Sequence, residues 1–419
     1  MIGALQRNWP LTARGTGALV LAVACFVVAH AAGLVELVYF GVLLVGALLA
    51  GFVSLWLTRR IDAVTRSLTP DVATVDRESI VTVRVALRSA LPAAASTWTD
   101  AVSAGLDGVG RGVFPALGSG LRGEERTIDL RYGVIGRTRG IHALGPFALT
   151  ATDPFGLTRR RVRRGGKTPV TVAPAVLELT SVPATAGEAG GMLQTVTAQP
   201  GQGADNLVAR PYAPGDSMRR IHWRATAHRD TLMVRQEEQE ASPGATVVLD
   251  RGAARWGADA TRAPGLDPDF ETAVSIAVSA AARLVRDGYA VDILDTDGTA
   301  LAERILGGEV HEIDALATQF ATLIARAGDG LARTAGMFAG TQAGPVFVVT
   351  GRVDLAEIDA LAPLTHHSSF PVLLSTRPAP GVVARAVGHG WHAAAVPADS
   401  DISEGWAAAL ERSAGHGFA

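Results

Sequence analysis

Cysteine is nearly absent from this sequence, because Cys25 is the only one among 419 residues. We therefore expect neither an internal disulfide nor a thiolate metal cluster. The formal net charge is also small, at −2. Such a balance does not favour wholesale nucleic-acid binding, so we expect no nucleic-acid partner. A chain of this length is expected to form two or three domains.

Residues 15–57 contain a single charged side chain, that of Glu36. A run of roughly 40 apolar residues is about twice what one helix needs to cross a bilayer. The sequence therefore predicts two spans, at 15–32 and 37–57, with a break where Gly33 loosens the helix. Lipid is expected to contact residues 15–57.

The flanking charges predict how this hairpin is oriented. Arg7 and Arg14 precede it, Arg59 and Arg60 follow it, and the short connection has neither Lys nor Arg. By the positive-inside rule both ends lie in the cytoplasm, and the soluble bulk is cytosolic. We assign residues 1–61 to a two-span anchor in the cell membrane.

Two other interpretations of this segment stay open. Residues 29–31 read Ala-His-Ala, the small-x-small form of a signal-peptide cleavage site. Cleavage would remove the first span, but the second would still hold the chain to the membrane. Alternatively, the two segments are buried core helices of a soluble protein.

Residues 62–180 favour a β-rich, sandwich-like domain. Along residues 79–87, Val81, Val83, Val85 and Leu87 alternate on one face, the pattern of a half-buried strand. Further short runs at 126–132, 141–150 and 170–172 are separated by turns rich in Gly or Pro, at the spacing of a β-sandwich.

Residues 153–157 interrupt this rhythm with the sequence Asp-Pro-Phe-Gly-Leu. Pro154 sets a turn after Asp153, and Gly156 allows a positive φ. We interpret the segment as a structural corner in which Phe155 and Leu157 are available to plug the core.

Five arginines follow within residues 159–164. They have two interpretations. On a solvated edge strand they block sheet-to-sheet aggregation. Near a membrane they contact lipid headgroups or another polyanion. No aromatic residues alternate with them, which disfavours a single-strand nucleic-acid groove.

Residues 181–240 form a linker that carries the densest motif of the chain, at 210–229, here called the signature segment. Pro214 and Gly215 predict a turn, and Asp216 or Ser217 is suited to cap a short helix. Its arginines, aromatics and histidines suit phosphate binding, or a buried ion-pair network with later glutamates. The candidate structural or partner-binding residues are Arg210, Tyr212, Gly215, Asp216, Arg220, His222 and Trp223. We expect them to form one cluster in which Trp223 is buried.

A hydrolase is the alternative for the same segment, using Asp216, Ser217 and His222. A Ser/His/Asp triad requires the three side chains to meet in space, and closeness in sequence does not provide that. No nucleophile elbow, Walker loop or zinc-protease motif accompanies them. We therefore expect a protein that is not an enzyme and needs no cofactor.

Two motifs together give a family resemblance. Residues 153–157 resemble a DPFGL element, and 210–229 resemble the signature R-x-Y-x-P-G-D-x-x-R-x-I-H-W-x-A-x-A-R of the bacterial domain of unknown function 58 family. His228 departs slightly from that pattern. The resemblance implies an accessory or scaffold protein that partners a MoxR-type AAA+ ATPase, alongside membrane transglutaminase-like proteins, in assembly or cell-envelope processes. It implies no known reaction.

Residues 241–419 alternate β-branched runs with helical ones, the pattern of a parallel sheet covered on both faces. Asp267 and Pro268 predict the start of the first helix. The family resemblance implies a von Willebrand factor A-like, Rossmann-like α/β domain. The alternation continues to a last predicted helix at 402–412.

Such domains hold a divalent cation with Asp-x-Ser-x-Ser after the first strand. The matching residues here begin at Asp250, but Gly252 and Ala254 replace both hydroxyls, and Arg251 adds a positive charge. Thr350, after a later strand, is a further oxygen donor. We interpret this as a degenerate crest that binds no metal, while a metal-dependent binding protein using Asp250 stays as the alternative.

Overall fold

The structure is a computed structural model. It describes residues 9–57, 60–88, 94–118, 126–183, 207–211, 221, 223, 226–227, 231–237 and 243–411. The chain divides into two compact units. The first comprises Met1–Ala175, Arg262–Leu266 and Ala317–Ile324, and the second comprises Val176–Thr261, Asp267–Leu316 and Ala325–Ala419.

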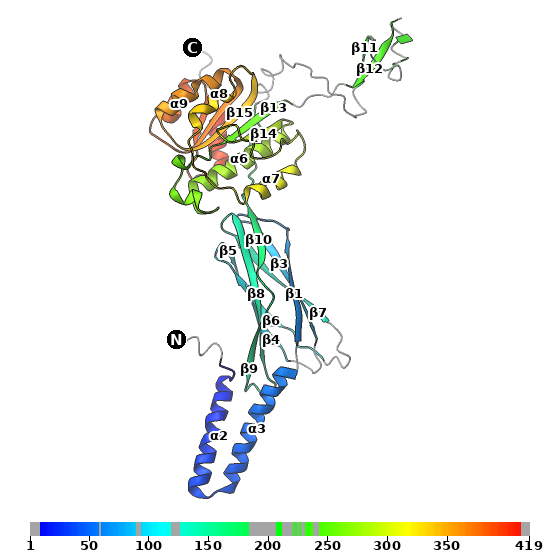
Figure 1. The fold of residues 1–419 in the computed structure, drawn as a ribbon, viewed down its shortest axis with the longest axis vertical. Coiled ribbons are helices and arrows are strands. Elements are labelled where there is room, and N and C mark those ends of the chain that lie inside the picture. The colour runs from blue at the N-terminus through cyan, green and yellow to red at the C-terminus, as the bar shows by residue number, and fades with distance from the viewer. Residues whose placement is uncertain are drawn as a thin grey trace. The chain divides into compact units, whose positions relative to one another are not determined.

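Two long apolar helices open the first unit (Figure 1), namely α2 (Ala13–Ala32) and α3 (Val35–Leu57). Thr12 caps α2 by accepting a hydrogen bond from the Gly15 amide, and Gly33 ends it with a φ of 65°. Each helix is long and apolar enough to cross a membrane, as predicted. Only 22% and 17% of their apolar windows are buried, which disfavours the core-helix alternative.

Two sheets pack face to face in the same unit (Figure 1). One has the order β1-β3-β7-β5, and the other has the order β2-β10-β8-β4-β6 with β9 paired to β8. The strands are β1 (Arg60–Thr69), β2 (Ala73–Thr74), β3 (Glu78–Arg88), β4 (Ser96–Val102), β5 (Leu106–Gly108), β6 (Arg111–Phe114), β7 (Arg126–Gly136), β8 (Gly140–Thr152), β9 (Arg159–Arg164) and β10 (Thr168–Ala173).

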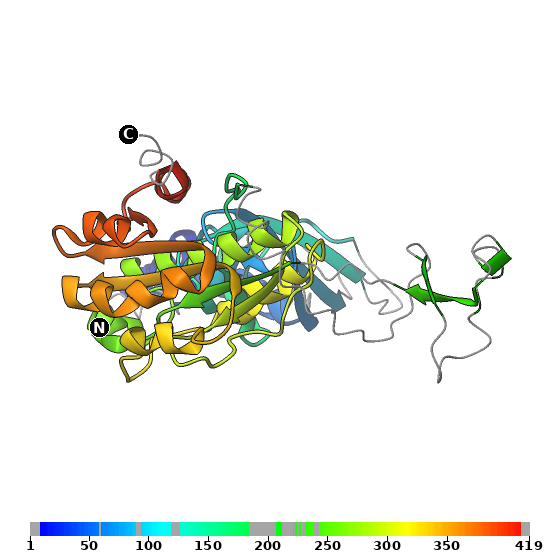
Figure 2. The ribbon, with the colours of Figure 1, turned by 90° about the horizontal axis from the view of Figure 1, so that it is seen from above.

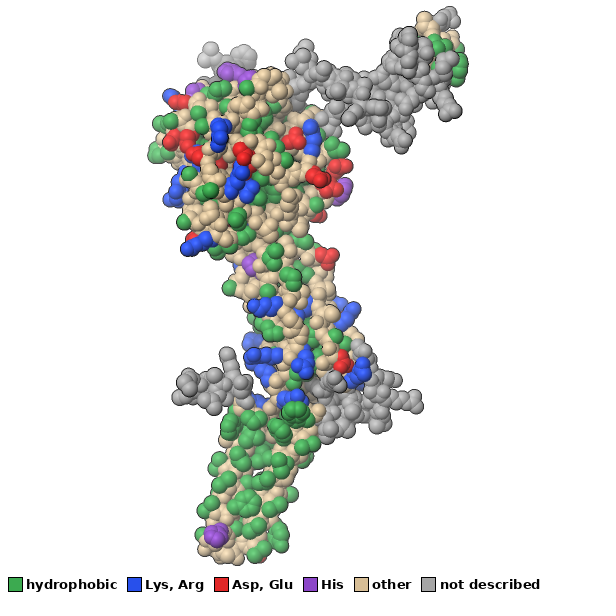
Figure 3. Space-filling view, viewed as in Figure 1, with side chains coloured by type: hydrophobic (Ala, Val, Ile, Leu, Met, Phe, Trp, Pro, Cys, Tyr) green, Lys and Arg blue, Asp and Glu red, His purple; other side chains and the backbone are tan. Residues whose placement is uncertain are grey.

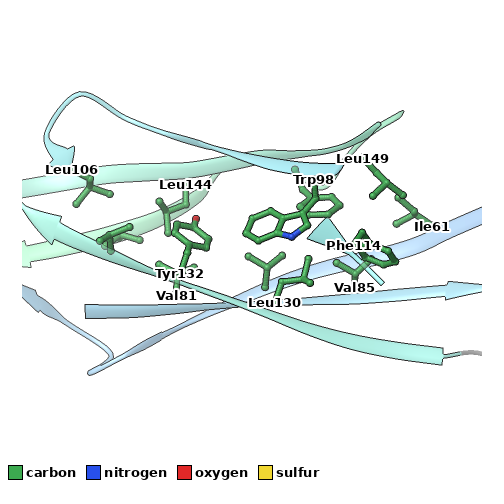
Figure 4. Close-up of a cluster of buried hydrophobic side chains, with 14 of the residues drawn as sticks. Ile61, Val81, Val85, Trp98, Leu106, Phe114, Leu130, Tyr132, Leu144 and Leu149 are labelled. Carbon is green, nitrogen blue, oxygen red and sulfur yellow. The ribbon is translucent and has the colours of Figure 1, made fainter. Parts of the chain in front are cut away.

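The predicted alternation builds the core between these sheets. Val81, Val83 and Val85 of β3 are fully buried, whereas Ile80 on the opposite face is 48% exposed. Figure 4 shows Trp98 at the centre of this core, and its ring lies 5.9 Å from that of Tyr132. Buried aromatic pairs of this kind add to the stability that their area alone provides.

A buried ion pair joins the two sheets. Arg66 of β1 donates two hydrogen bonds to the Asp100 carboxylate of β4, at 2.9 Å from Nε and 2.7 Å from Nη2. The Tyr132 hydroxyl donates a third, at 2.8 Å. Burial and the nearby Asp100 charge raise the pKa of Tyr132. The phenol therefore stays protonated and serves as a permanent donor.

The second unit contains a parallel five-stranded sheet with the order β14-β13-β15-β16-β17 and helices on both sides of it (Figures 1 and 2). The elements from residue 244 onward are β13 (Gly244–Leu249), η3 (Ala253–Arg255), η4 (Ala258–Thr261), α6 (Pro268–Arg286), β14 (Ala290–Leu294), α7 (Glu312–Phe320), η5 (Leu331–Arg333), α8 (Thr334–Met337), β15 (Ala343–Val353), α9 (Leu355–Leu361), η6 (Ala362–His366), β16 (Ser368–Pro378), α10 (Val382–Gly388), β17 (His392–Ala395) and α11 (Ile402–Glu411).

Burial on both faces explains the continuous apolar runs of these strands. On one face, Val348 belongs to a cluster with Ile358 of α9 and Val382 of α10. On the other, Phe347 stacks on Trp406 of α11 with ring centroids 5.0 Å apart. The mixed α/β class is therefore confirmed, and α11 is described as far as Glu411.

Helix starts follow the predicted chemistry. Asp267 caps α6 by accepting a hydrogen bond from the Phe270 amide, and Pro268 occupies the first turn. Hydrophobic periodicity alone would extend α7 through residue 325, but the helix ends at Phe320. Hydrophobic periodicity finds the element, but it does not mark where the last turn stops.

Candidate functional site at the sheet switch point

The candidate site lies where β13 and β15 run side by side. The chain leaves β13 to form β14 on one side, and later returns as β15 on the other. Open parallel sheets bind ligands at such a reversal, because the connections diverge there and leave a crevice outside the carboxyl ends of the strands. Asp250 follows β13, and its neighbour in β15 is Thr350. We call these residues and their ionic neighbours the crest.

Asp250 is fully buried and has a protein partner for each oxygen. The Gly252 amide donates to Oδ1 at 2.9 Å, and the Thr350 hydroxyl donates to Oδ2 at 2.8 Å. Oδ2 also lies 3.5 Å from Nε of Arg255. The Asp250 carbonyl oxygen accepts from the Trp256 indole at 3.1 Å. These contacts hold the carboxylate in one orientation.

Arg255 is the cation nearest to Asp250, and it is shared among three acids. Its Nη2 donates to Asp329 Oδ1 at 2.5 Å, and its Nη1 donates to Glu357 Oε1. Burial lowers the pKa of Arg255, but the hydrogen bonds to Glu357 and Asp329 outweigh burial, and the net shift is upward. Arg255 therefore carries a fixed positive charge inside the crest.

The electrostatic outcome at Asp250 differs from that of a simple ion pair. Burial raises its pKa to about 6, against the lowering effects of the Gly252 amide, the Thr350 hydroxyl and Arg255. Desolvation outweighs all three because Arg255 is not in hydrogen-bonding contact with the carboxylate. Asp250 therefore changes its charge within a mildly acidic range.

A second acidic group lies at the end of the next strand. Asp295 follows β14, is 1% exposed, and accepts at Oδ1 from the Thr296 amide at 2.7 Å. Arg326 Nε lies 2.9 Å from Asp295 Oδ2, and Arg251 Nη1 lies 3.7 Å from it. The Arg326 hydrogen bond also lowers the pKa of Asp297. The crest thus contains two sets of paired charges, one around Arg255 and one around Asp295.

The role given to Arg251 by the sequence is therefore corrected. Arg251 lies beside Asp295, and Arg255 takes the place beside Asp250. The short helix η3 produces this exchange, because one tight turn returns the chain so that residue 255 lies next to Asp250. Sequence reasoning also missed Asp295, although an aspartate directly after a buried strand was a usable signal.

The donor atoms at the crest have partners within the chain. Groups of three or more His, Cys, Asp or Glu arranged to hold a metal ion do not occur among the described residues. At the crest, the oxygens that Mg²⁺ would need are occupied by hydrogen bonds and arginines. The observed arrangement suits a rigid polar surface.

The signature segment lies largely outside the described residues. That applies to Tyr212, Gly215, Asp216, Ser217, Arg220 and His222, and so to the whole hydrolase candidate. Arg210 belongs to β11 (Leu207–Pro211), which pairs antiparallel with β12 (Met233–Glu237). Trp223 is 68% exposed, so the expected burial of its ring is corrected.

The turn at residues 153–157 is placed in the first unit. Gly156 has the predicted positive φ, at 70°. Asp153 is 4% exposed, but Phe155 is 63% exposed and does not plug the core. The expectation for Phe155 is therefore corrected, since this turn projects from the end of β8 and not into the space between the sheets.

Comparison with known proteins supports the family resemblance in one region. Residues 208–297 match the model of a family described as "Protein of unknown function DUF58". That description attaches no reaction to the family. No curated protein matches the chain.

A solved structure with a similar portion is the crystal structure of the CARDB domain of the PF1109 protein, in complex with di-metal ions, from Pyrococcus furiosus. It is 14% identical, and the match covers 27% of this chain and 94% of that one, with a TM-score of 0.18. A score this low supports no inference about function.

Proposed function

We propose that the protein is a membrane-anchored, non-enzymatic accessory or scaffold protein that binds a protein partner through the crest. The observation that carries the proposal is the closed charge network around Asp250. Each of its carboxylate oxygens already accepts a hydrogen bond from the chain itself, and Arg255 lies beside them. In a site built in this way, the chain's own donors compete with a metal ion for the Asp250 oxygens.

The finer fold assignment belongs to this proposal. In a von Willebrand factor A-like domain, the residues after the first strand hold a divalent cation. Here Arg255 supplies the positive charge at that place, bonded to Asp329 and Glu357. The ligand-binding edge of the sheet is thereby retained without its ion.

The outer part of the crest is accessible to a partner. The side chains of Asp329, Arg326 and Asp297 are 53%, 40% and 37% exposed. Charges at the rim of an interface set association rate and partner choice more than affinity. A partner with complementary charges would therefore be selected here, and the family resemblance makes a MoxR-type AAA+ ATPase the first candidate.

Anchoring by α2 and α3 completes the proposal. Arg7 and the arginines at 59 and 60 flank the two spans, so both ends face the cytoplasm, where an ATPase is accessible. Fusion of a reporter to the C-terminus tests this orientation. A cytoplasmic reporter should be active there, and activity of a periplasm-only reporter would overturn the assignment.

The partner claim is tested with the full chain in lipid nanodiscs and a purified MoxR-type ATPase, by biolayer interferometry. Asp329→Arg should weaken binding at least tenfold, because it reverses an exposed crest charge. Glu312→Arg is the control, because Glu312 is 49% exposed in α7 and takes no part in the crest. Equal affinity for wild type and Asp329→Arg would contradict the proposal.

A further inference from the structure

The membrane-facing end of the sandwich contains a turn and a strand that contact both the core and the helices. The turn is residues 153–157, and the strand is β9. The Thr12 amide donates to the Leu157 carbonyl oxygen at 2.9 Å, and the Thr12 hydroxyl donates to that of Gly156 at 2.6 Å. One step further, the Arg159 amide donates to Pro10 at 2.7 Å. The residues before α2 therefore pair with this turn.

Both helices approach the turn closely enough to require glycine. A Cβ added to Gly15 of α2 would lie 1.8 Å from the Leu157 carbonyl oxygen. A Cβ added to Gly51 of α3 would lie 2.6 Å from Asp153 Oδ2. Because each distance is below any real contact, the turn is held directly against both helices.

Asp153 shapes this turn from within. Its Oδ1 accepts from the Thr158 amide at 2.7 Å, and its Oδ2 accepts from the Phe155 amide at 3.3 Å. The carboxylate is thus satisfied by its own turn, and the Phe155 side chain is left 63% exposed.

The position along α3 places this turn at the membrane boundary. Gly51 lies six residues before the end of α3 at Leu57, which is about 9 Å at 1.5 Å per residue. Trp9 and Trp56 are 45% and 62% exposed near the same helix ends. Exposed aromatic rings of this kind are typical of the level between acyl chains and headgroups.

Strand β9 has two different rows of side chains. On one row, Arg160 donates to the Leu55 carbonyl oxygen at 3.2 Å, and its guanidinium lies 4.2 Å from the Trp56 ring centroid. The other row consists of Arg159, Arg161 and Arg163, all exposed. Successive members of a row are about 6.6 Å apart, because side chains alternate at about 3.3 Å per residue. Arg160 is thus fixed to α3, and the outer row forms a line of charge.

We propose that this outer row of β9, together with Phe155, is a binding surface for anionic phospholipid headgroups. Arg161 donates to the Thr99 hydroxyl at 3.4 Å, and among the described residues no carboxylate forms an ion pair with Arg161 or Arg163. Figure 3 shows Lys and Arg side chains gathered on the sandwich next to the apolar hairpin. Phosphate is the anion that arginine binds best in this setting. The inference rests on the membrane anchoring of the proposed function.

The edge-strand interpretation is compatible with this surface. β9 pairs with β8 alone among the described strands, so its arginines also prevent association with a second sheet. Edge protection, however, requires only charge. It does not explain why Arg160 binds the end of α3, or why the row begins beside the pairing of Arg159 with Pro10.

Screening predicts a gradient along the row. The Debye length is about 8 Å at physiological salt. Arg161 lies within about one Debye length of Arg159, whereas Arg163 lies about 13 Å from it. Arg161 should therefore contribute to lipid selectivity, and Arg163 should contribute much less.

The test reconstitutes the full chain in phosphatidylcholine bilayers and measures association of spin-labelled phosphatidylglycerol and spin-labelled phosphatidylcholine by electron paramagnetic resonance. Wild type should prefer phosphatidylglycerol, and 1 M salt should remove the preference. Arg161→Gln should lower it about fivefold, equivalent to about 1 kcal/mol per arginine at a membrane surface. Arg163→Gln should lower it less than twofold.

Two controls keep the result specific. Arg161→Lys retains the charge and should keep the preference, which excludes misfolding as the cause of a loss. The second control is Arg131→Gln, which removes an exposed arginine from β7, five residues after Arg126, where that strand begins. It should leave the preference for phosphatidylglycerol unchanged.

Equal association of the two lipids with wild type, or equal effects of Arg161→Gln and Arg131→Gln, would overturn the inference. Failure of the proposed function is seen separately. Release of the chain from bilayers by alkaline carbonate would show that it is not anchored. Retention without lipid preference would contradict only the headgroup surface, and ATPase binding is measured independently of both.

Discussion

The two units each bury an aspartate, but they neutralise it differently. Asp100 in the sandwich is 5% exposed and receives two bonds from Arg66 and one from Tyr132. Asp250 in the α/β unit is fully buried, and its arginine, Arg255, stays 3.5 Å away. Arg66 directs its two closest contacts to one carboxylate, whereas Arg255 divides its bonds among several acids.

The geometry of the arginine partner, and not burial alone, therefore decides the role of a buried carboxylate. A bidentate pair with a phenol donor fixes two sheets together, and its role is structural. At the crest, desolvation prevails and raises the pKa of Asp250 to about 6. That carboxylate therefore changes charge in a range that cells reach.

The largest expected effect is at the sandwich pair. Arg66→Ala leaves Asp100 buried and unpaired, which should lower the free energy of unfolding by about 3–5 kcal/mol. Urea unfolding, followed by hydrogen exchange of amides in β3 and β7, measures the loss. Replacing both partners, with Arg66→Met and Asp100→Leu, should recover part of it. If Arg66→Ala were as stable as wild type, the contrast between the two aspartates would disappear.

Asp250→Asn should act in the opposite direction at neutral pH. The folded pKa of about 6 lies above the unfolded value of 3.8, so the folded state binds more protons between these values, and stability falls as pH rises through that window. The variant removes this fall. At pH 7.5 it should be more stable than wild type by about 2–3 kcal/mol, from roughly two pKa units at 1.36 kcal/mol each.

Denaturation of the α/β unit at pH 4 and pH 7.5 checks this expectation. At pH 4 the two proteins should be nearly equal, because Asp250 is then protonated in the folded state. A wild-type profile without any decline between pH 4 and 6.5 would contradict the raised pKa of Asp250.

A smaller effect is expected from Thr350→Val. The variant removes the hydroxyl that donates to Asp250 Oδ2, which should cost about 1–3 kcal/mol. Because that bond lowers the pKa of Asp250, the decline in stability should move to higher pH. Ser375→Ala is the matched control, since the buried Ser375 hydroxyl donates to the Gly351 carbonyl oxygen instead. The control should leave the pH profile in place, and an identical shift in both variants would contradict the assignment.

The smallest effect is expected at an exposed pair in the same sheet as Arg66. Arg84 and Asp129 make two hydrogen bonds, at 2.9 and 3.1 Å, almost the geometry of the buried pair. Solvent screens them, so Arg84→Gln should leave the thermal midpoint unchanged within error. A clear drop in that midpoint would mean that the hydrogen-bond geometry of an ion pair contributes more to stability than its burial.

Much of the fold was predictable because its causes are local. The alternation of Val81, Val83 and Val85 predicted their burial in β3, and Asp267 predicted the start of α6. The predicted spans agree with α2 and α3 to within two residues at each end. Period, capping and apolar length depend on neighbours within a few residues.

The candidate site was predictable only in part. Asp250 and Thr350 were identified because each lies by the end of a buried strand, and parallel strands bring their ends together. The choice between Arg251 and Arg255 was not predictable, since it depends on one turn of η3. The exposure of Phe155 and Trp223 was also not predictable, because the apolar character of a side chain does not indicate which surface will cover it.

Three features follow from the sequence alone. They are the two apolar spans, the change from a strand-rich region to alternating strands and helices, and the residues that cap helices and form turns. These follow from periodicity and side-chain chemistry at short range. The tertiary structure alone decided the order of the α/β sheet and the closing of Asp250 by Thr350, 100 residues away. It also decided the contact of Asp153 with Gly51. Such contacts depend on which surfaces pack together, and that packing is settled by the whole fold at once.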